Sequence, residues 1–153
     1  MTHPSVSTLW TSYRAENGDA PERPAAVFHF CDNAEDAGIC LDLVLKGKKR
    51  ATAASLAELE LSGAPVPQVG DLSVVTDFDG VAHGIIRTTQ VDIRAFDDVD
   101  GEFAAAEGEG DGSLEWWRNA HAAYYGRVLS GHGIAVDGNL QIACERFVLV
   151  ASR

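Results

Sequence analysis

Lysine is scarce in this sequence and confined to one place. All three lysines, Lys46, Lys48 and Lys49, fall within four positions, and Arg50 follows them directly. The chain as a whole is acidic, with 23 carboxylates against 12 lysine and arginine side chains and a formal net charge of −11. The broad basic face that sequence-independent binding of duplex DNA requires is therefore excluded. The single cationic run instead predicts a local site for an anion such as phosphate.

Three further features are missing, and each narrows the class of protein. No stretch approaches the ~20 consecutive apolar residues of a membrane helix, so no membrane partner is expected. The first residues, Met1 to Ser5, have neither the charged nor the apolar region of a secretory signal. The three cysteines form no C-x-x-C pair, which argues against a structural zinc site and favours buried thiols in a reducing cytoplasm.

The length of 153 residues and the hydrophobic content of 46% predict one folded domain over residues 1–153. Apolar patterns predict strands near residues 26–30, 72–76, 82–96 and 140–150 and helices near residues 7–16, 32–46 and 114–129. Residues 51–60 are expected to hold a short strand followed by a helical turn. The connections are often too short for parallel crossovers. We therefore expect an α+β fold with a curled, mostly antiparallel sheet or small barrel and two or three packed helices.

Local signals mark the boundaries of several of these elements. Asp32 and Glu35 form a D-x-x-E helix start related to the capping box. Gly47 is expected to end the same helix, because glycine adopts the left-handed conformation at low cost. Asp79-Gly80 predicts a tight type I′ hairpin. The alternation of acid and glycine over residues 107–111 is not expected to form regular structure.

The segment Gly47-x-Lys49-x-x-Thr52 combines a turn, a cation and a hydroxyl. If the chain turns after Gly47 and enters a strand, Lys49 and Thr52 can converge on one pocket. Lys49 would then bind phosphate, or act as a base if burial lowered its pKa. Thr52 would orient a substrate or attack it. The alternative interpretation is a solvated helix end followed by a strand threonine.

The run Glu107-Gly108-Glu109-Gly110-Asp111 brings carboxylates together on a flexible backbone. Glu107, Glu109 and Asp111 offer oxygen ligands of the kind that Mg²⁺ and Mn²⁺ prefer, so these ions are the candidate cofactors. The acids alternatively cap the helix that follows. A third interpretation, which we prefer, is that one of them pairs with Lys49 or Arg50 and shapes the pocket.

The helix expected near residues 114–129 carries several candidate ligand-binding side chains. Trp117, His121 and Tyr125 share its inward face, where a hydrogen-bonded core histidine and core aromatics are the ordinary interpretation. The aromatics could alternatively stack on a base. Arg118 lies beside this face and has the geometry for bidentate contact with phosphate.

Two strand residues carry charges that need a partner or an open face. Arg87 interrupts the apolar run of its strand and is a candidate phosphate ligand. Glu145 in the last strand likewise needs a partner or an open face, but its charge is negative. Each has the alternative of an ordinary ion pair.

The order of these motifs resembles the ASCH-domain family of the PUA-like superfamily, in its longer bacterial branch. The resemblance covers nearly the whole chain. It rests on Trp10 and Tyr13, the segment Gly47 to Thr52 with Ser55, Pro67-x-x-Gly70-Asp71, the run Glu107 to Asp111 with Ser113, Trp117-Arg118 with His121, and Cys144-Glu145-Arg146-Phe147.

The resemblance implies a small β-barrel with a cleft beside Gly47–Thr52 that binds RNA or a nucleotide-like ligand. Some members of the family look like ribonucleases, and others remove an acyl group from modified cytidine. In that amidohydrolase branch, the lysine and threonine of the motif act with a glutamate from a downstream strand. Lys49 and Thr52 match, but the strand from Ala82 to Asp92 contains no glutamate, which puts this reaction in doubt.

We therefore expect a domain that binds single-stranded RNA or a nucleotide derivative and hydrolyses it. Lys49, Thr52 and Glu109 would be catalytic, with Glu145 as an alternative carboxylate. The alternatives are a binding module without turnover and an N4-acetylcytidine amidohydrolase. The remaining substrate contacts would come from Arg50, Arg87, Glu107, Asp111, Trp117, Arg118, His121, Tyr125 and Glu145.

Overall fold

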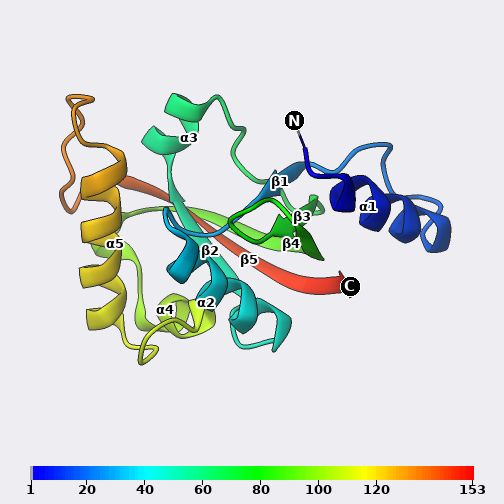
Figure 1. The fold of residues 1–153 in the computed structure, drawn as a ribbon. Helices are drawn as coiled ribbons and strands as arrows, with labels where there is room; N and C mark the ends of the chain where they lie inside the picture. Colours follow the sequence, from blue (N-terminus) through cyan, green and yellow to red (C-terminus); the bar gives the residue numbers. More distant parts are fainter. Residues whose placement is uncertain (1) are drawn as a thin grey trace.

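The computed structural model describes residues 2–153, which form a five-stranded sheet surrounded by helices (Figure 1). The helices are α1 (Pro4–Glu16), α2 (Ala34–Leu45), α3 (Leu56–Ser62), α4 (Gly101–Glu107) and α5 (Leu114–Val128), with a short 3-10 helix, η1 (Phe96–Asp98). The strands are β1 (Ala26–Phe28), β2 (Ala51–Ser55), β3 (Leu72–Thr76), β4 (Ala82–Ala95) and β5 (Gln141–Ser152).

The sheet is a curled, mixed half-barrel with strand order β1-β3-β4-β5-β2. The β1–β3 pair is parallel and the three other pairs are antiparallel. The expected α+β class with a curled, mostly antiparallel sheet is thus confirmed. The long strands β4 and β5 run through its centre, and α1 and α5 lie at opposite ends (Figure 1).

Helices on both sides of the molecule bury apolar side chains against this sheet. Trp117 and Tyr125 of α5 pack on one part of it together with residues of β2 and β5. Leu41 and Val44 of α2 form a second cluster, and Trp10 of α1 belongs to a third. Among the described residues, no helix is both long and apolar enough to cross a membrane.

The described part of the chain has five α-helices where two or three were expected. Helix α3 follows β2 where a short strand and a helical turn were expected, whereas α4 lies in the acidic stretch after β4, for which no helix was expected. Helix α4 forms in the acidic stretch because the Asp100 side chain accepts a hydrogen bond from the N–H of Phe103 at 2.9 Å and caps it. Phe103 and Ala104 are then buried on its inner side.

Two local predictions also need correction. The N-cap of α2 is Asn33, whose side chain accepts a hydrogen bond from Asp36, whereas Asp32 pairs with Arg127 at 2.9 Å. The β3–β4 connection is not a two-residue type I′ turn, since only Gly80 in it has a positive φ. The Asp77 carboxylate instead holds a longer loop by accepting from backbone N–H groups.

Candidate functional site

The cationic run lies where the chain leaves α2 and enters β2. Gly47 has φ +77° and ends the helix, as predicted. The N–H groups of Lys48 and Lys49 then donate to the carbonyl oxygen of Leu43 at 2.9 and 3.1 Å. Arg50 donates its N–H to the carbonyl oxygen of Ala106 in α4 at 2.8 Å. These bonds fix the backbone of the run on both sides of Lys49.

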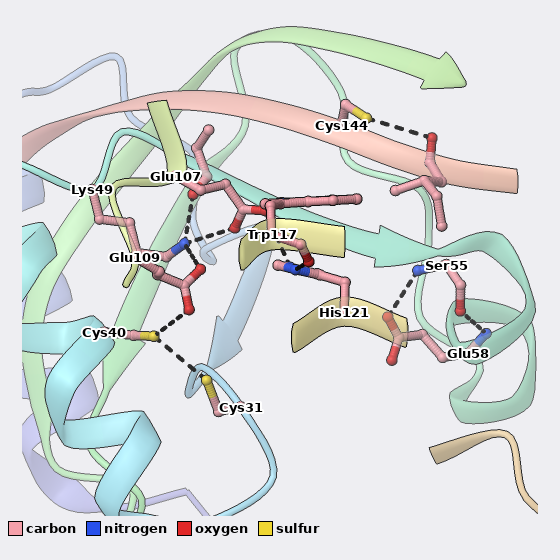
Figure 2. A network of polar contacts seen from close by, with 12 residues as sticks. Cys31, Cys40, Lys49, Ser55, Glu58, Glu107, Glu109, Trp117, His121 and Cys144 are labelled. Carbon is pink, nitrogen blue, oxygen red and sulfur yellow. Dashed lines mark hydrogen bonds and ion pairs between the residues drawn. The ribbon is translucent and has the colours of Figure 1, made fainter. Parts of the chain in front are cut away.

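Lys49 is buried, with only 2% of its surface exposed. Its ammonium donates to Glu107 Oε1 at 2.8 Å, to Glu109 Oε2 at 2.9 Å and to the carbonyl oxygen of Ala51 at 2.8 Å (Figure 2). The preferred interpretation, in which an acid of the acid–glycine run pairs with Lys49, is confirmed. All three ammonium protons have acceptors, so none is left for a ligand.

Gly108 allows both glutamates to reach the same ammonium. It follows the last residue of α4 with φ +68°, and a Cβ atom there would lie 2.5 Å from the carbonyl oxygen of Lys48. Glycine is needed at this point for its conformation and for the close approach of the two backbones. The acid–glycine alternation therefore builds a helix end that is closely packed against Lys48 and Lys49.

Helix α5 supplies the next partners of Glu107. The indole N–H of Trp117 donates to Glu107 Oε2, and His121 Nε2 lies 3.2 Å from the same oxygen (Figure 2). His121 Nδ1 lies 2.9 Å from the carbonyl oxygen of Trp117. Because both ring nitrogens face acceptors, the imidazolium form satisfies the site best.

The ionisation of this network follows from burial and pairing. Burial alone would lower the pKa of Lys49 and of His121, but the carboxylates of Glu107 and Glu109 outweigh it and raise both pKa values. Burial would raise the pKa of Glu107, but Lys49 and His121 lower it. Two cations thus balance two carboxylates. The lowered pKa that a basic role of Lys49 requires is not found.

The network reaches solvent at two side chains. Glu109 is 15% exposed and His121 is 11% exposed, against 1–2% for Lys49 and Glu107. Two surface depressions lie elsewhere, one of about 360 Å³ beside α3 and one of about 350 Å³ beside β1. Neither is lined by a residue of the network.

Thr52 belongs to a different group of side chains. In the β2–β5 pair it lies directly opposite Glu145, so both side chains project from the same face of the sheet. Glu145 is buried, and its Oε2 accepts from the Thr88 hydroxyl at 2.6 Å. Burial raises the pKa of Glu145, and the hydrogen bond from Thr88 only partly offsets this. Within residues 2–153, no hydrogen bond joins Thr52 to Lys49, so the expected convergence is not seen.

The other predicted site residues are scattered. Arg118 donates to the carbonyl oxygen of Asp97 at 3.1 Å, whereas the Tyr125 hydroxyl is buried without a partner in the described chain. Asp111 accepts from the N–H of Ser113 at 2.9 Å in the turn before α5. Arg50 and Arg87 are exposed, and neither forms an ion pair with a described residue.

Sequence reasoning missed the cysteines that adjoin the network. Cys40 Sγ donates to Glu109 Oε1 at 3.1 Å, and Cys31 Sγ lies 3.4 Å from Cys40 Sγ (Figure 2). Cys40 lies on the buried face of α2, which the helical spacing indicated, but nothing local to the sequence places Glu109 beside it. The role of Thr88 as the partner of Glu145 was missed for the same reason.

Comparison with known proteins gives a consistent result. A family model described as the ASCH domain matches residues 26–151. A crystal structure of an ASCH domain from Lactobacillus crispatus is similar, with 30% identity, a TM-score of 0.86, and coverage of 97% of this chain and 95% of that one. A crystal structure of a protein from Enterococcus faecalis shares 26% identity and a TM-score of 0.86, with coverage of 95% and 88%. Among curated proteins, none matches the chain significantly.

Proposed function

The chain belongs to the ASCH domain family, and on that premise we propose that it binds short single-stranded RNA or a nucleotide derivative through Lys48 and Arg50. Domains of this family generally bind RNA. Lys48 and Arg50 would contact the phosphate instead of Lys49, because the Lys49 ammonium already donates to three protein acceptors.

One observation carries the proposal: two exposed cations flank a buried, charge-balanced anchor. Lys48 and Arg50 are exposed and form no ion pair within residues 2–153, although carboxylates far outnumber cations in the chain. The buried side chain of Lys49 and the backbone bonds of the run hold both residues in place. Such a fixed pair of cations can contact phosphate without first ordering a mobile loop.

The size of the partner follows from the charge. Residues i and i+2 of an extended segment project to the same side, and burial of Lys49 with exposure of Lys48 and Arg50 agrees with that alternation. Two cations on an acidic surface support contact with a few phosphates only. A short single strand or a mononucleotide fits this limit, whereas a long duplex would meet the surrounding carboxylates.

The test is binding of a fluorescent single-stranded RNA of about ten nucleotides, measured by anisotropy at several salt concentrations. The double variant Lys48→Glu with Arg50→Glu should lose most of the affinity. Each phosphate contact removed should reduce the slope of log affinity against log salt by about 0.7. Arg14→Glu, which changes an exposed cation on α1, is the matched control and should bind as the unaltered protein does.

Equal binding by the double variant and the control would overturn the proposal. A substrate-binding role of Arg87 can be read from the same titration. If Arg87 contributes, Arg87→Ala should remove a third contact and lower the slope by a similar amount of about 0.7.

Ribonuclease-like hydrolysis is a second candidate, supported by the pair at the solvent-facing edge of the network. The pKa of His121 is raised, and its ring lies in one cluster with the Glu109 carboxylate. To protonate RNA as a general acid, the ring would have to leave Glu107 or the Trp117 carbonyl oxygen. The length of the RNA recovered from the binding experiment shows whether it is cleaved. The incubation is done with and without Mn²⁺ or Mg²⁺. Intact RNA after prolonged incubation with excess protein would exclude hydrolysis and leave RNA binding as the function.

N4-acetylcytidine deacylation has weaker support. Thr52 does have a glutamate opposite it, Glu145 of β5, which compensates for the absence of one in β4. Lys49, however, is engaged with Glu107 and Glu109 instead of this pair. The three groups that the reaction would use therefore do not meet.

A further inference from the structure

Three side chains from distant parts of the chain meet at one edge of the Lys49 network. Cys31 follows β1, Cys40 lies in α2, and Glu109 follows α4. The two sulfur atoms are 3.4 Å apart, and Cys40 Sγ lies 3.1 Å from Glu109 Oε1. All three ligand atoms lie within 4.8 Å of one another (Figure 2).

We propose that Cys31, Cys40 and Glu109 form a binding site for a thiophilic divalent cation of the Zn²⁺ type. Two sulfurs and one carboxylate oxygen are a donor set that Zn²⁺ accepts, whereas Mg²⁺ and Mn²⁺ prefer oxygen ligands. Three protein ligands leave the fourth tetrahedral position for water or a ligand group. The site is independent of RNA binding by Lys48 and Arg50.

The spacing of the sulfurs favours a metal over a disulfide. Tetrahedral coordination with Zn–S bonds of about 2.3 Å separates two sulfurs by roughly 3.8 Å. The observed separation of 3.4 Å is a few tenths of an ångström from that value. A disulfide needs about 2.05 Å, and each sulfur would have to move much further to form it.

The backbone of Cys31 provides a second, independent observation. Among residues 2–153 it is the only residue other than glycine with a positive φ, at +62°. A positive φ is unfavourable for every residue except glycine. A residue with a side chain keeps this conformation only where the surrounding structure imposes it. Here the conformation places Sγ beside the Cys40 thiol. Cys31 is partly exposed, so a cation can enter from that side, while Cys40 is buried.

The neighbouring cluster of Glu107, Glu109 and His121 is a poorer site. The Lys49 ammonium already lies between the two carboxylates, at 2.8 and 2.9 Å from their oxygens. A divalent ion there would have to displace a buried cation. Glu109 serves both sides, because Oε2 accepts from Lys49 while Oε1 faces the Cys40 thiol.

Binding leaves the Lys49 pair in place and changes the protonation of the thiols. The Cys40 thiol loses the proton that it donates to Glu109 Oε1, and the cation binds this oxygen in its place. Both sulfurs bind the cation as thiolates. Two protons pass to the solvent, and no electron is transferred. Metal binding should therefore release two protons per site at neutral pH.

The experiment uses the full chain, reduced and confirmed to contain three free thiols, with Co²⁺ as the probe under anaerobic conditions. One equivalent of Co²⁺ should produce a thiolate-to-cobalt charge-transfer band in the near ultraviolet. One equivalent of Zn²⁺ should abolish this band. Proton release measured in weak buffer should approach two per metal ion.

Variants assign the ligands. Cys31→Ser and Cys40→Ser should each lose the charge-transfer band, and Glu109→Gln should weaken metal affinity by at least about tenfold. Cys144→Ala is the matched control, because Cys144 is buried in β5 away from the pair, and it should keep the band. Circular dichroism of the metal-free variants verifies their folding.

Two outcomes overturn the proposal. One is the absence of a cobalt band in unaltered protein with three free thiols. The other is a band of equal strength in the double variant Cys31→Ser with Cys40→Ser, which would place the metal elsewhere.

Discussion

At the scale of single residues, Lys49 acts as an internal counter-ion to Glu107 and Glu109. Its position in the motif indicates a cation aimed at a ligand, but its 2% exposure and three protein acceptors assign that charge to the protein interior. A buried ion pair adds little net stability, since desolvation opposes the attraction. Loss of one partner is costly, because it leaves an unpaired buried charge.

Substitution of Lys49 by methionine tests this assignment. The variant keeps most of the side-chain volume but removes the cation between Glu107 and Glu109. We expect it to lower the free energy of unfolding by about 3–5 kcal/mol in urea titrations. Lys46→Met is the matched control, because Lys46 pairs with Asp42 at the surface, and it should change stability by less than about 1 kcal/mol. A similar small effect for both variants would contradict the assignment.

Glu145 provides a pH test at the same scale. Burial raises its pKa in the folded state above the ordinary value of 4.5. The stabilisation linked to its protonated form is complete below the unfolded pKa and is lost as pH rises through the folded pKa. Glu145→Gln lacks this titration. Its melting temperature relative to the unaltered protein should therefore be higher at pH 7 than at pH 4.

The control for this measurement is Glu22→Gln, a substitution of an exposed loop carboxylate. Its melting temperature relative to the unaltered protein should change little between the two pH values. A constant difference for Glu145→Gln across that range would show that the Glu145 carboxylate does not titrate with unfolding.

At the scale of elements, the short helix α4 and the glycine that ends it position the network. Asp100 caps the helix, its apolar side packs on α5 and β2, and Gly108 turns the chain against Lys48. Glu107 lies just before that turn and Glu109 just after it. The two carboxylates therefore approach Lys49 from both sides of one helix end.

Gly108→Ala measures how closely this helix end is packed. Gly63 ends α3 with φ +71°, nearly the same as the +68° of Gly108, but an added Cβ at Gly63 meets nothing within 4 Å. Gly63→Ala should destabilise by about 1–2 kcal/mol from backbone conformation alone. Gly108→Ala should cost more, because its Cβ would collide with the Lys48 backbone. Equal losses in urea unfolding would contradict this close packing.

At the scale of the whole molecule, charge is divided between interior and surface. The interior network is neutral, with Lys49 and His121 against Glu107 and Glu109. The excess of carboxylates is carried by the surface, where it repels nucleic acid except near exposed cations. A chain of net charge −11 belongs to a family that generally binds RNA, and the contact proposed for Lys48 and Arg50 is compatible with that charge because it is small and local.

The sequence alone determined the features that depend on neighbouring residues. Hydrophobic periodicity placed β3, β4, α5 and most of α2, and the positive φ of Gly47 followed from its place after the helix. The motif order indicated the family, and the acid–glycine run was correctly paired with the cationic run. These predictions succeed because repeat patterns and turn chemistry act over a few residues.

The tertiary structure decided what those residues do. Burial made Lys49 an interior counter-ion, and strand register placed Thr52 opposite Glu145. Folding brought Cys31, Cys40 and Glu109 together, which no cysteine motif in the sequence indicates. Burial and long-range proximity depend on how distant segments pack. Ionisation and ligand binding are set by these local surroundings. Spacing along the chain therefore singled out Lys49, Thr52 and Glu109 but gave neither their contacts nor the cysteines beside them.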